Sequence, residues 1–230
     1  MAATDPESRK RLDQFVDAAF GFAVTLLVIL GAQPETLDDL RSALLNIPAS
    51  AAAFILIVLF WQAHKVFARI TPHRDNLTTL ISLAIVFTVL VYVFPLKLLV
   101  QGLFFWISGG RLPGKGLIDD MGDLALLYQV YGIGFAVLSG LYAWLFVRSK
   151  ALAPTPELAE DARSWRDSWL ICAATGVIST LLALLPIQHV PWLPPTMYST
   201  IPLVIWLREG AVQRARARAA LAAAPVEGQA

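Results

Sequence analysis

The feature that most constrains this chain is a series of six apolar stretches within 230 residues. A transmembrane helix needs about 20 mostly apolar residues. The candidate stretches are Phe15–Gln33, Ile47–Phe67, Leu77–Leu99, Leu124–Val147, Trp169–Leu185 and Met197–Trp206. The composition, 57% apolar and 15% charged, also departs from that of soluble domains, in which about a quarter of the residues are charged. We therefore predict an all-α integral membrane protein with six transmembrane helices.

Three segments add detail to this plan. The sixth stretch is the shortest, and prolines precede and interrupt it: Pro191, Pro194, Pro195 and Pro202. Leu98–Ile107 is apolar but too short to span alone, and we expect it at the outer surface, with its aromatic rings at headgroup level. The sequence TLDDLRSALLNI predicts a short amphipathic helix capped by Thr36, because threonine is a favoured N-cap and Asp38 and Asp39 then lie near the positive end of the helix dipole.

Lys and Arg residues indicate the orientation, because cytoplasmic loops carry an excess of both. With the N-terminus inside, the cytoplasmic side collects Arg9, Lys10, Arg11, Lys65, Arg69, Arg74, Arg148, Lys150, Arg163, Arg166, Arg208, Arg214, Arg216 and Arg218. The outer side keeps Arg41, Lys97, Arg111 and Lys115. We expect a multi-pass plasma-membrane protein with both termini cytoplasmic, in which residues 1–210 form the six-span domain and residues 211–230 a basic helix end with a frayed tail.

The sequence contains none of the common catalytic signatures. HExxH, GxSxG, a Walker loop and a paired-cysteine ligand set are all missing from it, and the three histidines, His64, His73 and His189, are scattered. The single Cys172 fits a small packing residue. The net charge of +1 points to no nucleic-acid partner. We expect no enzyme activity, no metal site and no resident cofactor.

One face of the first span is apolar between polar ends. At about 100° per residue, Phe22, Leu26, Ile29 and Gln33 fall in one narrow stripe, and Phe15 and Arg11 extend it toward the N-terminus. Asp17 lies on nearly the opposite side. On a single helix such a stripe fits lipid contact or core packing as well as a functional surface.

Asp17 needs partners, because a carboxylate inside a span costs a few kcal/mol unless it is paired or hydrated. Trp61 and His64 lie at i and i+3 at the cytoplasmic end of the second span, and Asn76 opens the third on the same side. These side chains could form one polar cluster at the inner end of the first three helices. Such a cluster would either join the helices through hydrogen bonds or act as a proton relay.

Arg11, Phe15, Val16 and Asp17 open the first span in the pattern Arg-x-x-x-Phe-Val-Asp. FWQAHKVFARI lies in the second span, and RDNL and FPLK lie near the two ends of the third. These four segments resemble the transmembrane protein 175 family, the lysosomal potassium channel and its bacterial relatives. The first resembles the Arg-x-x-x-Phe-Ser-Asp signature of that family's first helix, the second its Trp-x-x-His-His segment, and the last two the ends of its third helix. The chain departs from the pattern at three positions: Val16 replaces Ser, Lys65 replaces the second His, and Phe22 replaces an Ile that narrows the pore.

The resemblance implies a potassium-permeable cation channel built as a homotetramer in the lipid bilayer. Four copies of the first helix would line the pore, and Phe22, Leu26 and Ile29 would form stacked apolar rings with Gln33 at the outer mouth. The inner structural network would comprise Arg11, Phe15, Asp17, Trp61, His64 and Asn76. A TVGYG-like filter is missing from the sequence, so we expect weak to moderate selectivity for potassium over other monovalent cations.

Three alternatives remain open from the residues alone. Asp17 and His64 could change protonation in a proton-coupled secondary transporter. The same pair could serve as acid and base in a membrane-embedded enzyme. The first helix could also simply pack an oligomer in a non-conducting scaffold.

Overall fold

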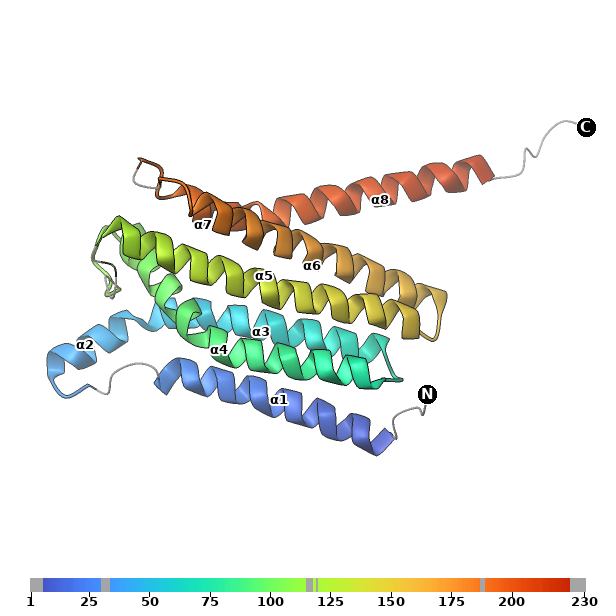
Figure 1. Cartoon of the computed structure of the whole chain (residues 1–230), viewed down its shortest axis with the longest axis horizontal. Coiled ribbons are helices and arrows are strands. Elements are labelled where there is room, and N and C mark those ends of the chain that lie inside the picture. The colour runs from blue at the N-terminus through green and yellow to red at the C-terminus, as the bar shows by residue number, and fades with distance from the viewer. Residues whose placement is uncertain (1–5, 30–33, 115–117, 119, 187–188, 224–230) are drawn as a thin grey trace, which may run out of the picture.

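The computed structural model describes residues 6–29, 34–114, 118, 120–186 and 189–223. Every regular element in these ranges is a helix, and Figure 1 shows their order along the chain. The helices are α1 (Pro6–Ile29), α2 (Leu37–Leu45), α3 (Ile47–Ile70), α4 (Asn76–Ile107), α5 (Met121–Leu152), α6 (Pro156–Leu182), α7 (Leu193–Ser199) and α8 (Ile201–Ala223). The predicted all-α class is confirmed for the described residues.

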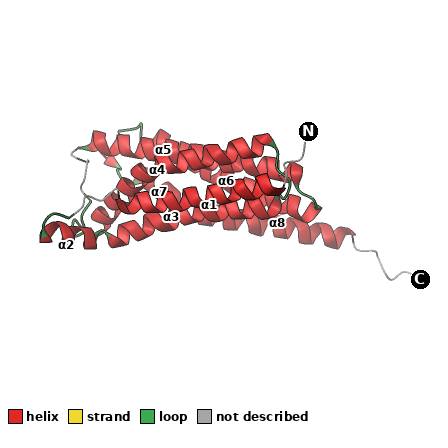
Figure 2. Ribbon diagram, turned by 90° about the horizontal axis from the view of Figure 1, so that it is seen from below, coloured by secondary structure: helices red, strands yellow, loops and turns green. Residues whose placement is uncertain are grey.

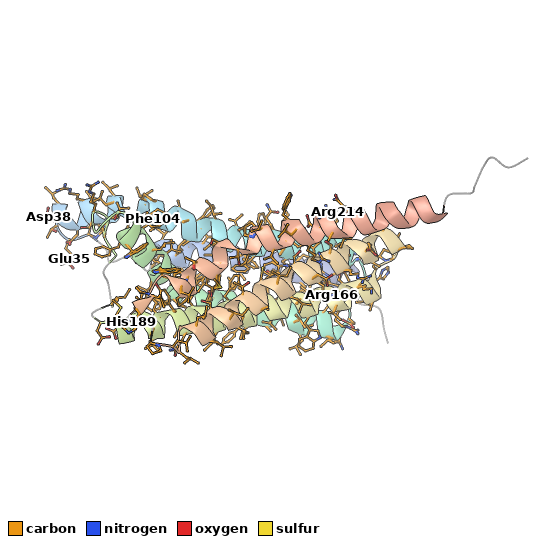
Figure 3. All side chains as sticks on the ribbon, turned by 90° about the horizontal axis from the view of Figure 1, so that it is seen from above. Glu35, Asp38, Phe104, Arg166, His189 and Arg214 are labelled. Atoms are coloured by element: carbon orange, nitrogen blue, oxygen red, sulfur yellow. The ribbon has the colours of Figure 1, made fainter. Side chains whose placement is uncertain are left out.

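Six of the helices are long, and they run roughly side by side in an elongated bundle (Figures 1 and 2). In Figure 1, α1 forms one margin, α3 and α4 follow it, and α5, α6 and α8 complete the series. Contacts agree with this order, because α1 packs on α3 and α4, α5 packs on α4 and α6, and α8 packs on α6. We call the end where α1 begins the N-terminal end of the bundle. Figure 3 shows Arg166 and Arg214 toward that end, and Glu35, Asp38, Phe104 and His189 toward the other.

Four helices are long and apolar enough to cross a membrane, among the residues searched. They are Arg9–Ile29 within α1, Ile47–Ile70, Asn76–Ile107 and Met121–Leu152. The other two long helices mix an apolar part with a charged one: α6 is charged before Trp169, and α8 is apolar only near its start. The six predicted segments therefore all lie in or overlap helices, but spanning by α6 and α8 stays a prediction.

Two predicted details of local structure can be compared directly. Thr36 caps α2 as expected, since its hydroxyl accepts from the Asp39 backbone N–H at 3.1 Å and the Asp39 carboxylate accepts from the Thr36 backbone N–H at 3.0 Å. Leu98–Ile107 is not a separate segment, because it continues α4 through Pro95 as one helix, and its place at the outer surface stays a prediction. A helix tolerates an internal proline when tertiary packing supports its flanks.

Rings from three helices fill the centre of the bundle. Tyr142 of α5 stacks on Trp169 of α6 with centroids 4.6 Å apart and on Phe60 of α3 at 6.2 Å. The Tyr142 hydroxyl also donates to the Phe60 carbonyl at 2.6 Å, which satisfies a fully buried polar group. This aromatic cluster connects α3, α5 and α6.

Close contact between α5 and α6 depends on two glycines. A Cβ added at Gly176 would lie 2.9 Å from the Gly132 carbonyl oxygen and 2.9 Å from the Ala136 backbone nitrogen. Small residues of this kind let helix backbones approach each other in membranes. By contrast, a Cβ at Gly140 of α5 would meet nothing within 4 Å.

Gly176, in the contact, and Gly140, outside it, allow a matched test of the α5–α6 packing. We expect Gly176→Ala to lower stability by about 1–3 kcal/mol, because backbone atoms must separate to admit the methyl group. Gly140→Ala should be neutral or stabilising by up to about 1 kcal/mol, since alanine favours helix and open space surrounds it. Thermal unfolding in detergent measures both, and equal midpoints for the two variants would contradict the tight contact.

Candidate functional site

The first helix has one face built into the bundle. Val16, Phe20, Ala23 and Leu27 are buried and lie at i, i+4, i+7 and i+11, so they form a single stripe on α1. This stripe packs against α3 and α4. Because the spacing follows the helix period without interruption, the rotation of α1 about its own axis is determined by these four side chains.

The predicted pore stripe lies mostly on the other side. Phe15, Phe22 and Ile29 are 53%, 56% and 65% exposed in the single chain, whereas Leu26 is partly buried and touches the core. The apolar line is therefore largely free of contacts within the subunit, and Leu26 marks its border with the buried face. Gln33, expected at the outer mouth, lies outside the described residues.

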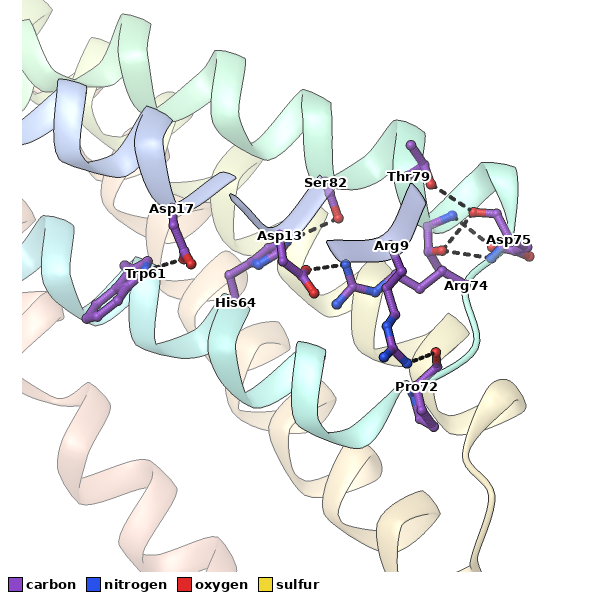
Figure 4. Close-up of polar contacts among 11 residues, drawn as sticks. Arg9, Asp13, Asp17, Trp61, His64, Pro72, Arg74, Asp75, Thr79 and Ser82 are labelled. Carbon is purple, nitrogen blue, oxygen red and sulfur yellow. Dashed lines mark hydrogen bonds and ion pairs between the residues drawn. The ribbon is translucent and has the colours of Figure 1, made fainter. Parts of the chain in front are cut away.

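The predicted inner network divides into separate contacts (Figure 4). The Trp61 indole N–H donates to the Asp17 carboxylate at 2.8 Å, so α3 and α1 meet through this pair. His64 is buried instead against α4, where its Nε2 lies 3.2 Å from the Ser82 hydroxyl. Asn76 is exposed at the first position of α4. Asp17 and Trp61 are therefore in contact as predicted, whereas His64 contacts Ser82 of α4 instead.

The remaining two members lie at the free surface of α1. Arg11 is exposed and forms an i, i+4 ion pair with Glu7 at 2.9 Å. Phe15 is exposed one turn further along. An exposed pair of this kind adds little stability, about 0.3–0.5 kcal/mol.

An ion pair between a buried arginine and a partly exposed aspartate, which sequence reasoning missed, anchors the start of α1. The guanidinium of Arg74, only 3% exposed, donates to the Asp13 carboxylate and lies over the Phe67 ring, 4.9 Å from its centroid. Arg9 adds a bond to the Pro72 carbonyl at 2.7 Å. The spacing of Arg9, Asp13 and Asp17 at i, i+4 and i+8 was the available signal, because it places three polar groups on one side of the helix.

The turn between α3 and α4 is tied to α5 in the same region. Asp75 caps α4 through the Thr78 backbone N–H at 2.8 Å and also accepts from the Arg148 guanidinium. Burial opposes ionisation of this carboxyl, but the hydrogen bonds from Thr78 and Arg148 outweigh it, so the pKa of Asp75 lies below its ordinary value of 3.8. The hydroxyls of Thr71 and Ser149 lie 2.5 Å apart and add a second link to α5.

A hollow of about 530 Å³ opens beside the first turns of α1. It is lined by Glu7, Arg9, Lys10, Asp13, Gln14 and Asp17. Its lining is mixed in charge, and three of its side chains already have partners in the bundle. Among the described residues, no group of three or more His, Cys, Asp or Glu side chains could hold a metal ion.

The comparisons with known proteins agree on one family. A family model described as "Endosomal/lysosomal potassium channel TMEM175" matches residues 11–95. A protein from Marivirga tractuosa named "Potassium channel" is 30% identical over 198 residues, which cover 81% of this chain and 77% of that protein. The chain belongs to the TMEM175 family of potassium channels.

Two solved structures extend the TMEM175 likeness beyond the residues of the family model. A variant of the potassium channel MtTMEM175 has a TM-score of 0.75 at 23% identity, covering 89% of this chain and 93% of that one. A lysosomal potassium-selective channel TMEM175 homolog from Chamaesiphon minutus has a TM-score of 0.61 at 18% identity, covering 88% and 98%. At these identities the likeness establishes the fold, and it includes most of the chain after residue 95.

The resemblance stated from sequence is thus confirmed, and the structure gives each departure from the TMEM175 pattern a setting. Val16 is fully buried in the α1 stripe, where an apolar side chain packs without needing a hydrogen-bond partner. The Lys65 ammonium lies over the Trp61 ring, 4.4 Å from its centroid, and so adds a cation–π contact beside the Asp17 pair. Phe22 stands exposed on α1. The TMEM175 family is a family of channels and not a class of enzymes.

Removing the Asp13–Arg74 ion pair should lower the stability of the protein. Asp13→Asn removes the charge that faces a buried guanidinium, so we expect a cost of about 1–3 kcal/mol. The partial exposure of Asp13 favours the lower part of that range. Thermal unfolding in detergent measures it, with Asp38→Asn on exposed α2 as the control. Equal midpoints for the two variants would show that the pair does not anchor α1.

Asp75 predicts a dependence of stability on pH. Its folded pKa is lowered, so its contribution to stability is present above the unfolded value of 3.8 and is lost as the pH falls through the folded pKa. Between about pH 5 and about pH 3 the midpoint temperature of thermal unfolding should therefore fall further for the wild type than for the Asp75→Asn variant. Asparagine is also a good N-cap, so the variant keeps the cap of α4. Parallel curves for the two proteins would contradict this assignment.

Proposed function

We propose that this chain forms a homotetrameric, potassium-permeable channel in which four copies of α1 surround the permeation path. The observation that supports this most is the division of α1 into two faces. Val16, Phe20, Ala23 and Leu27 bind it to its own bundle, whereas Phe15, Phe22 and Ile29 are more than half exposed in the single subunit. An uncovered apolar line on a helix at the margin of the bundle fits a symmetric assembly around that line.

Rings of Phe22, Leu26 and Ile29 would act as a hydrophobic constriction. Such a ring gives an ion no oxygen to replace its hydration shell and tends to exclude water, so the barrier rises steeply as the radius falls. Potassium holds its water less tightly than sodium and would cross at lower cost. This mechanism gives modest selectivity, unlike the strong discrimination of a carbonyl filter.

The charge distribution supports an orientation with the N-terminal end of the bundle in the cytoplasm. Arg166 and Arg214 lie toward that end, while Glu35 and Asp38 lie toward the other (Figure 3). Acidic groups and Gln33 at the outer mouth would raise the local cation concentration, an effect that salt screens. With α6 and α8 crossing as the fifth and sixth spans, both termini would be cytoplasmic in the plasma membrane.

Reconstitution separates this function from its rivals. Purified protein in liposomes should carry electrogenic potassium flux without a co-substrate and should show single-channel steps in planar bilayers. Saturable flux that requires a proton gradient would indicate a carrier, and the absence of both signals would indicate a scaffold. A mass measurement in detergent that gives an assembly other than four chains would contradict the tetramer.

Phe22→Ala tests the constriction directly. Removing the ring widens the neck and should raise potassium flux at least about tenfold, which corresponds to lowering the barrier by about 1.4 kcal/mol. Phe87→Ala is the matched control, because Phe87 is the same residue type and is also exposed, but lies on α4. Flux that rises equally in both variants, or in neither, would show that Phe22 does not line the path.

A further inference from the structure

Lys97 is an unusual residue for its position. It lies within α4, 21 residues after the helix begins, and only 7% of it is exposed. From sequence we expected it among the few charges of the outer side, but the structure buries it between helices. An ionisable side chain inside a span is costly and generally marks a specific partner or a functional role.

The partner of Lys97 is the backbone of α1. Its Nζ donates to the Leu27 carbonyl oxygen at 2.9 Å. Leu27 lies in the last described turn of α1, between Leu26 and Ile29 of the apolar line. A long lysine usually extends toward the headgroups, whereas this one is directed to a main-chain oxygen.

The bond is also distinctive in its location along α1. The polar links from α1 to the bundle through Arg9, Asp13 and Asp17 all lie in its first half. Among the hydrogen bonds of the described residues, that of Lys97 is the one that joins the second half of α1 to another helix. Pro95 lies two residues before Lys97, and Figure 1 shows the last part of α4 turning away from the line of its first part. Proline bends a helix in this way because it removes a backbone bond and its ring needs space.

We propose that Lys97 is a positioning residue of the pore, which ties the last turn of α1 to α4 and so sets the width of the constriction at Leu26 and Ile29. This inference rests on the proposed function, because it assumes that α1 lines the path. Without the tie, packing alone would hold the last turn. That turn could then lean toward the axis, where the apolar side chains of four subunits attract one another, and the neck would narrow.

A spin label on Val28 reports the tie without any need for conduction. Val28 lies beside Leu27 and is exposed, so a label there is tolerated. In full-length protein with Cys172→Ala, reconstituted in liposomes, we expect Lys97→Met to narrow the central line of the label spectrum, which indicates greater mobility. A label on Gln14 should not change, because the first half of α1 keeps its own anchors. Lys97→Arg, which retains charge and donors, should restore the wild-type spectrum at Val28.

Potassium flux supplies the second measurement. We expect Lys97→Met to lower flux at least about threefold and Lys97→Arg to restore it. If Lys97→Met does not fold, the shorter and uncharged Lys97→Gln should loosen the Val28 label in the same direction. Unchanged mobility at Val28 in the folded Met or Gln variant would overturn the proposal, as would a Lys97→Arg spectrum equal to that of Lys97→Met.

The two measurements separate this inference from the proposed function. If the wild type conducts no potassium but the Val28 label still becomes more mobile in Lys97→Met, the channel function is refuted. The contact between α4 and α1 through Lys97 is then still supported. A conducting protein whose flux is unaffected by a loosened label would show that the tie does not set the constriction.

Discussion

The packing of one face of α1 against α3 and α4 is the interaction on which the rest of the structure depends. Within a bilayer, lipid tails are as apolar as leucine, so helices associate through close packing and polar links instead of a strong hydrophobic drive. The stripe of Val16, Phe20, Ala23 and Leu27 supplies that packing and determines which side of α1 is left uncovered. Any role for Phe22 in permeation follows from this rotation.

Charged groups hold α1 near its two ends. Asp13 and Asp17 connect its first half to Arg74 and Trp61, and the carbonyl of Leu27 receives Lys97 near the other end. A charge within a membrane span is costly unless it is paired or hydrated, and each of these groups meets a specific partner outside α1. The middle of α1, around Phe22, is held by packing alone. Polar contacts near both ends would hold α1 in position, and its apolar middle could then line the proposed pore.

Much of the fold could be read from local patterns. Five of the six apolar stretches lie mainly in long helices, and the sixth is divided between the short α7 and the start of α8. Thr36 with Asp39 marked the start of α2, because a capping box involves residues only three positions apart. The third span was predicted to end at Leu99, whereas α4 continues as one helix to Ile107. The polar contacts were harder. Asp17 and Trp61 were correctly placed close together, but His64 turned out to bond Ser82, and the pairs Arg74–Asp13 and Lys97–Leu27 join residues more than 60 positions apart.

The sequence by itself determined the class of the molecule, the helices and the family, because hydrophobic periodicity, caps and short motifs are properties of neighbouring residues. It also determined that Phe22, Leu26 and Ile29 share one face of α1, since a helix repeats every 3.6 residues. Only the tertiary structure decided which face of α1 is buried and which partner each charge finds. Those choices depend on the crossing of α1 with α3 and α4, where the shapes of side chains distant in sequence must fit together.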